Sequence, residues 1–157
     1  MNITENCKLE LKNVISFRGK VTQQHMSQIM KEMEQIIRDN LAEKNGPSVT
    51  ATFSVENNGL QPIMDIEVLI PLNKEVHVPA DYKFKPVFRL NNAVKIRHRG
   101  NPAMLQNSAN ELMRYITDHK LMPITAGYNV TVQEPADQND VDSLIVDMYV
   151  GVSDNIL

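Results

Sequence analysis

The second half of this chain repeats the first half at an offset of 80 to 81 residues, and this repeat restricts the folds that the sequence can adopt. Residues 17–19 (Phe-Arg-Gly) precede one Met/Ile-rich helical pattern, and residues 98–100 (His-Arg-Gly) precede another. A fixed-period match of this length indicates two copies of one supersecondary unit. We therefore expect a pseudo-twofold arrangement with a central groove between the copies. The matched positions are Met33 with Met113, Ile36 with Ile116, Leu41 with Leu121, Gly46 with Gly127, and residues 66–70 with residues 146–150.

The first copy has the pattern of a strand, a helix and a two-strand hairpin. Apolar residues alternate over 9–17, which predicts a half-buried strand. Apolar residues then recur at spacings of three and four over 26–41, which predicts a helix with Thr22 as its N-cap. Residues 48–55 and 64–70 alternate again and predict the two strands of the hairpin.

The second copy has the same order of patterns. Together the two copies predict an α+β fold in which two antiparallel sheets are each backed by one long helix. The predicted elements of the second copy are an edge strand at residues 84–86, a strand at 94–99, a helix start at Asn101-Pro102, a helical stripe over 105–121, and strands at 128–132 and 144–152.

The length of 157 residues predicts one domain. The first repeat spans about residues 8–72, a linker spans 73–81, and the second repeat spans about 82–153. Each repeat is small for independent stability, so we expect the two to share one core.

Composition excludes several classes of function. The net charge of −3 argues against direct DNA binding, which needs a concentrated basic face. Cys7 is the single cysteine, so no intrachain disulfide is expected. The chain has no apolar run of about 20 residues and no secretory pattern near its start, so we expect a cytoplasmic protein that makes no membrane contact.

Five basic residues gather within residues 89–99 of the chain. We interpret most of them as the solvated face of a strand. Arg18 and Arg99, each followed by glycine, are interpreted as repeated turn architecture in preference to anion contacts. The local cluster is Arg89, Lys95, Arg97, His98 and Arg99.

Strand parity gives the most specific functional indication. Because side chains alternate along a strand, Asp147 points away from the helix that Val146, Met148 and Val150 contact. The same reasoning places Ile66, Val68 and Ile70 under the first helix. Glu67 then occupies the position equivalent to that of Asp147, on the face that the helices leave uncovered.

The repeat, the Arg-Gly turns and the closing residues 147–152 (Asp-Met-Tyr-Val-Gly-Val) resemble the gyrase-inhibitor-like, or effector-binding, domains of bacteria. These are similar to the ligand-sensing halves of multidrug-responsive transcription regulators. The resemblance covers residues 9–152 and implies a ligand groove between the copies. Family members commonly carry a glutamate where this chain has Asp147, which implies a counter-charge for cationic, lipophilic ligands.

This chain departs from the family in two respects. Aspartate is one methylene shorter than glutamate, and the aromatic lining is thin because tryptophan is absent. Tyr82 is a further aromatic candidate. The expected ligand-binding residues are Asp147, Tyr149, Glu67, Tyr128 and Phe17.

The alternative for Glu67 and Asp147 is that both are surface acids on an exposed sheet face. Tyr149 is either the hydrogen-bond partner of Asp147 or an ordinary packed tyrosine. The four histidines share no ligand spacing and Ser108 and Ser143 have no evident base, so we expect no metal, no cofactor and no catalytic constellation.

Three functions follow, in order of preference. The first is a non-catalytic binding module for a small organic molecule. The second is a protein-interaction or accessory role on a gyrase-type target or in a toxin or secretion cluster, favoured by the acidic loop at 134–142. The third is a small hydrolase that uses Asp147 with Tyr149. A homodimer through an edge strand at 84–90 is also considered.

Overall fold

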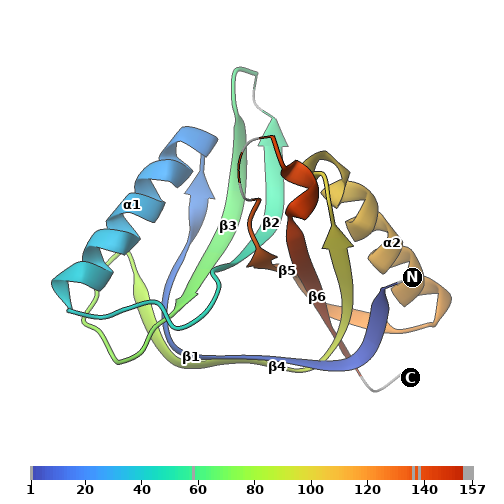
Figure 1. Cartoon of the computed structure of the whole chain (residues 1–157), viewed down its shortest axis with the longest axis horizontal. Coiled ribbons are helices and arrows are strands. Elements are labelled where there is room, and N and C mark those ends of the chain that lie inside the picture. Colours follow the sequence, from blue (N-terminus) through green and yellow to red (C-terminus); the bar gives the residue numbers. More distant parts are fainter. Residues whose placement is uncertain (1, 58, 136, 138, 154–157) are drawn as a thin grey trace. The chain divides into compact units, whose positions relative to one another are not determined.

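The computed structural model describes residues 2–57, 59–135, 137 and 139–153, and it confirms the predicted α+β class (Figure 1). The chain divides into two compact units, residues 11–88 (the first unit) and residues 1–10 with 89–157 (the second unit). No helix in the described part of the chain is long and apolar enough to cross a membrane. The elements are β1 (Ile3–Val21), α1 (Gln23–Asp39), β2 (Val49–Asn57), β3 (Pro62–Pro71), β4 (Lys83–Arg99), α2 (Leu105–Asp118), β5 (Met122–Gln133) and β6 (Ile145–Ser153), with short 3-10 helices at Pro102–Met104 and Val141–Ser143.

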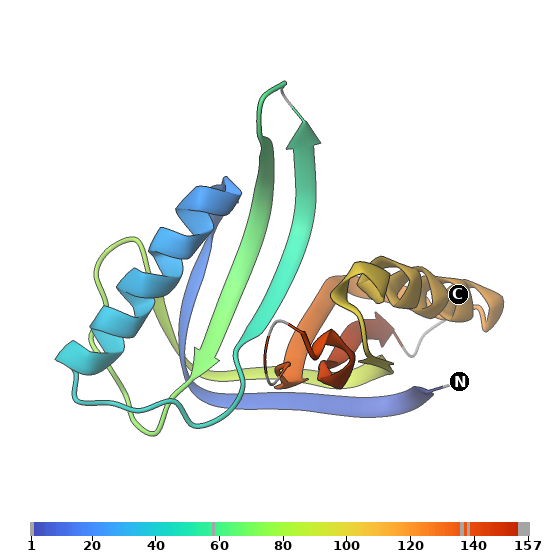
Figure 2. The ribbon, with the colours of Figure 1, turned by 45° about the horizontal axis from the view of Figure 1, so that its top comes forward.

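In the first unit, β3 lies between β1 and β2 and pairs antiparallel with both. Helix α1 runs along one face of this sheet, and Figure 2 shows it beside the long β2–β3 hairpin. The predicted N-cap is confirmed, because the Thr22 side chain accepts a hydrogen bond from the backbone N–H of His25 at 3.2 Å. The core under α1 contains the predicted helix-side residues of β3, Ile66, Val68 and Ile70, packed with Ile29, Met33, Ile36 and Ile37.

In the second unit, β6 lies between β4 and β5 and pairs antiparallel with both. Asn101 caps the turn before α2 by accepting a hydrogen bond from the backbone N–H of Ala103, and Pro102 follows it at the first helical position, as predicted. Met148 and Val150 pack under α2, as strand parity predicted, and Val146 is buried. Their partners on the helix are Leu112 and Ile116.

Two apolar residues of the predicted helical stripes, Leu41 and Met113, are exposed. Leu41 lies beyond the end of α1 and is 84% exposed, because Asn40 ends the helix and Leu41 adopts a left-handed conformation with a φ of 53°. Met113 is 42% exposed, whereas its neighbour Leu112 is fully buried. The sequence match of Met33 with Met113 therefore pairs a core residue with a surface residue.

The two Arg-Gly sites differ, and the interpretation of both as turns is wrong for the first. Strand β1 continues through Arg18 and Gly19 to Val21, and a Cβ on Gly19 would lie 2.9 Å from the Phe17 ring. Glycine is used there for close packing. Gly100, by contrast, follows the end of β4 with a φ of 103°, a conformation that favours glycine.

Two predicted strand boundaries also change. Residues 84–86 and 94–99 belong to one continuous strand, β4, because Pro86 interrupts the donor pattern without ending the extended backbone. Strand β1 extends well beyond residues 9–17 at both ends. Asn6 and Asn13 within it have φ values of 57° and 54°, a conformation that asparagine tolerates. Residues 136 and 138 of the predicted acidic loop lie outside the described residues.

Candidate functional site

The face of β4–β6–β5 that points away from α2 carries the charged and aromatic residues of the second unit. In the strand register, Lys95 lies opposite Tyr149 and Arg97 lies opposite Asp147. Tyr128 on β5 lies opposite Tyr149 on its other side. We call these five residues the Asp147 face. The structure therefore brings together three residues that the sequence predicted, Asp147, Tyr149 and Tyr128.

Asp147 is buried and is held by Arg97. The guanidinium of Arg97 donates two hydrogen bonds to the carboxylate, Nε to Oδ1 at 2.7 Å and Nη2 to Oδ2 at 2.9 Å. Asp147 is only 4% exposed, so the alternative of a surface acid is wrong for it. The hydrogen bond from Arg97 to Asp147 raises the pKa of the guanidinium, which keeps the arginine positively charged. The acid is thus neutralised by a residue of its own unit.

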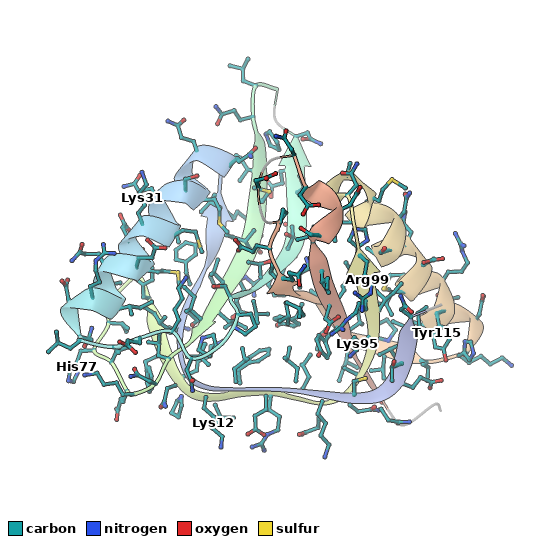
Figure 3. The ribbon with its side chains drawn as sticks, viewed as in Figure 1. Lys12, Lys31, His77, Lys95, Arg99 and Tyr115 are labelled. Atoms are coloured by element: carbon teal, nitrogen blue, oxygen red, sulfur yellow. The ribbon has the colours of Figure 1, made fainter. Side chains whose placement is uncertain are left out.

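Lys95 supplies a second positive charge beside the same carboxylate. Its Nζ lies 3.9 Å from Asp147 Oδ2, beyond hydrogen-bond distance, and 5.9 Å from the centre of the Tyr149 ring. The Lys95 side chain is only 25% exposed. Among the residues that the structure describes, neither the Lys95 ammonium nor the Tyr149 hydroxyl finds a hydrogen-bond partner. Figure 3 labels Lys95 on β4 in the second unit.

Tyr149 keeps its proton to a higher pH than an ordinary tyrosine. Burial raises the pKa of the Tyr149 hydroxyl, and the negative charge of Asp147 raises that pKa further. The phenol is therefore a hydrogen-bond donor throughout the neutral range. Tyr128 beside it is buried, so the Asp147 face combines two tyrosines with three charged groups.

The expectation of a solvated basic face is wrong for His98, which is buried at 5% exposure. Lys95 and Arg97 are partly exposed, and Arg99 is exposed as expected. Strand parity predicts the different burial of His98, because residues 95 and 97 share one face of β4 whereas residue 98 points to the helix side. The pairing of Arg97 with Asp147 had no local signal, since the two lie 50 positions apart in the sequence.

In the first unit, the structure places Glu67 and Phe17 on opposite faces of the sheet. Lys85 Nζ lies 2.9 Å from Glu67 Oε2, and the Glu67 side chain is 10% exposed, so this acid is also buried and paired. Phe17 packs against the core under α1 and lies 5.8 Å from the ring of Tyr82, centre to centre. The aromatic contact of Phe17 is therefore made on the helix side, away from Glu67.

Arg18 makes its contacts on the surface of the first unit. Its guanidinium donates hydrogen bonds to both oxygens of Asp65, at 2.9 and 3.1 Å, and lies 3.5 Å from the centre of the Phe53 ring. The hydrogen bond from Arg18 lowers the pKa of the Asp65 carboxyl. Arg18 is thus a cross-strand ion-pairing residue.

A cleft of about 620 Å³ lies between the end of β4 and the first turns of α2. His98 Nδ1 is 2.8 Å from the Ser108 hydroxyl there, so the expectation that Ser108 lacks a neighbouring base is wrong. His98 Nε2 lies 3.1 Å from the carbonyl oxygen of Asn101, and donation to that carbonyl leaves Nδ1 to accept from Ser108. This arrangement ties the strand end to the helix. Arg99 and Arg114 line the same cleft.

The comparisons with known proteins identify structural neighbours. No protein-family model matches the sequence, and the comparison with curated proteins finds no match either. The fold is similar to the crystal structure of the EcmrR C-terminal domain, with a TM-score of 0.74, 15% identity, and coverage of 98% of this chain and 99% of that one. Against EcmrR in a cryo-EM structure of its DNA complex, the TM-score is 0.77 and the identity 16%, and the match covers 98% of this chain but spans only 58% of the EcmrR chain.

A third neighbour was solved with a ligand. The structure of SAV2435 bound to tetraphenylphosphonium matches with a TM-score of 0.52 and 13% identity, covering 97% of this chain and 93% of that one. A hydrolase from Listeria innocua, encoded by lin2189, matches with a TM-score of 0.58 and 11% identity, covering 95% and 93% of the two chains. At these identities the likeness shows a shared fold.

Proposed function

We propose that this chain is a non-catalytic binding module that takes a small organic molecule on the Asp147 face. The observation that carries the proposal is the buried Asp147 carboxylate with the partly exposed Arg97 and Lys95 beside two tyrosines, on the side of the sheet that α2 leaves uncovered. The ligand-bound structure of SAV2435, which shares the fold, supports the same class of function.

The energetics of burial support a binding role for this group. Partial burial removes some of the hydration of a charge, and Lys95, whose side chain is 25% exposed, has only a long contact with Asp147. The Tyr149 hydroxyl is a second donor that no described residue satisfies. Small-molecule sites combine apolar and aromatic surface with a few such polar groups. A ligand acceptor would satisfy both donors.

We also propose that the two units descend from one duplicated strand–helix–hairpin unit. The strand order β1–β3–β2 with α1 matches the order β4–β6–β5 with α2. Glu67 lies opposite Arg18 in one sheet, and Asp147 lies opposite Arg97 in the other. A groove between the copies, a protein partner and a dimer all stay predictions.

A hydrolytic role for Asp147 gains no support from its contacts. A general base needs a free carboxylate oxygen directed at the proton that it removes. Both oxygens of Asp147 accept hydrogen bonds from Arg97, so neither is directed at a substrate proton.

A thermal-shift screen tests the binding proposal. The purified chain is screened against lipophilic cations, lipophilic anions and neutral aromatic compounds, because a ligand at 100 times its Kd stabilises a protein by about 2.7 kcal/mol. Hits should lose most of their effect in Tyr149→Leu and keep it in Glu34→Gln, which changes an exposed residue of α1. If no compound raises the Tm, or if Tyr149→Leu responds like the parent, the proposal fails and a protein partner becomes the better hypothesis.

A further inference from the structure

The charge of the ligand can be inferred from the Asp147 face, provided that the proposed binding function holds. The resemblance of the sequence to effector-binding domains implied a free acid that attracts a cation. In the structure, both oxygens of that acid instead accept hydrogen bonds from the Arg97 guanidinium. Lys95 then adds a further positive charge, so one carboxylate stands against two cations and the local sum is +1.

A cationic ligand would meet an unfavourable field at this site. To reach the Asp147 carboxylate it must displace a bidentate guanidinium, which is among the strongest partners that a carboxylate has. If Arg97 stays in place, the cation approaches Lys95 and Arg97 across a partly buried surface. Two like charges 4 Å apart repel by about 1 kcal/mol in bulk water and by more near a protein surface.

An anion meets the opposite situation. The Lys95 ammonium has three donors and no hydrogen bond to a described residue, and Tyr149, its partner in the strand register, has its ring centre 5.9 Å from Lys95 Nζ. A carboxylate or similar group beside Lys95 would accept from both residues. The rings of Tyr149 and Tyr128, adjacent in the register, would contact the apolar part of the ligand.

We propose that the Asp147 face selects a small aromatic organic anion and discriminates against lipophilic cations. Lys95 binds the anionic group, Tyr149 donates a hydrogen bond to it, and Arg97 is neutralised by Asp147 and holds the strand pair in place. The ligand that this chain prefers then has the opposite charge to tetraphenylphosphonium, the ligand bound in the structure of SAV2435.

The sharpest test compares two ions of the same shape and opposite charge. Tetraphenylborate and tetraphenylphosphonium differ at the central atom, so their hydrophobic contributions match closely. Binding is measured by calorimetry and thermal shift, with 1-naphthoate and 1-naphthylmethylammonium as a smaller pair. We expect the anion of each pair to bind more tightly. Lys95→Gln should weaken 1-naphthoate, whose carboxylate can approach the ammonium, at least about fivefold, the factor that corresponds to about 1 kcal/mol for a charge at 4 Å in water.

Lys31→Gln is the matched control. It removes the same charge from an exposed position on α1, in the first unit (Figure 3). It should leave the anion preference unchanged, which separates a local effect of Lys95 from a change in net charge.

Each outcome has a defined meaning. Tighter binding of the cations, or an anion preference that Lys95→Gln does not reduce, overturns the inference and leaves the binding function standing. If no ion of either pair binds, the proposed binding function loses its support and the inference falls with it. Circular dichroism of Lys95→Gln confirms that the variant is folded.

Discussion

The packing of α2 allows a quantitative test with two adjacent residues. Leu112 is fully buried among Val94, Ile96, Met148 and Val150, whereas Met113 is 42% exposed. Leu112→Ala removes three carbon atoms from the core, which costs about 2.4 kcal/mol at about 0.8 kcal/mol for each methylene. The cavity that remains raises the total to about 3–4 kcal/mol, within the range measured for buried leucines.

The expected contrast between the two variants is large. Met113→Ala should cost about 0.5–1 kcal/mol, because a surface side chain leaves no cavity. A loss of 3–4 kcal/mol lowers the Tm by about 6–16 °C for a chain of this size. Urea unfolding followed by circular dichroism measures the free energies, and calorimetry measures the Tm. Equal costs for the two substitutions, or a larger cost for Met113→Ala, would refute the assignment of Leu112 to the core under α2.

Two further predictions concern the first unit. Arg18 lowers the pKa of Asp65, so their ion pair stabilises the folded state at pH values above the ordinary carboxyl pKa of about 3.9, and this stability is lost as the pH falls through the lowered native pKa. The Tm of the parent should therefore fall more steeply than the Tm of Asp65→Asn between about pH 4 and 2. Parallel Tm curves would argue against the ion pair. Thr22→Ala removes the side-chain acceptor for the His25 N–H and should cost about 1 kcal/mol in urea unfolding, whereas an unchanged midpoint would show that water replaces the cap at no cost.

Elements with a strong local period were predictable from the sequence. The helix-side residues of β3 and β6 followed from alternation alone, because a half-buried strand must place every second side chain in the core. The N-caps Thr22 and Asn101 followed from side-chain chemistry at a helix start. These features depend on neighbours within a few residues, which the sequence shows directly.

Features that depend on register between distant strands were not predictable. Asp147 and Glu67 were expected as acids on an uncovered face, but their partners Arg97 and Lys85 lie 50 and 18 positions away. A shift of the β4–β6 pairing by one residue would turn Arg97 away from Asp147. The same limit explains Arg18 and Gly19, which have the composition of a turn but lie within a strand whose partner, β3, extends alongside them.

The pairing of Asp147 with Arg97 also constrains how this chain can change in descent. Loss of the acid alone would leave two cations side by side in a partly buried place, and loss of the arginine alone would leave a buried carboxylate with one distant partner. Either single substitution should therefore destabilise the folded chain more than the joint replacement of both residues by neutral ones. Because the two substitutions are coupled in this way, we expect a chain with this fold to keep the two charged residues together or to replace them together.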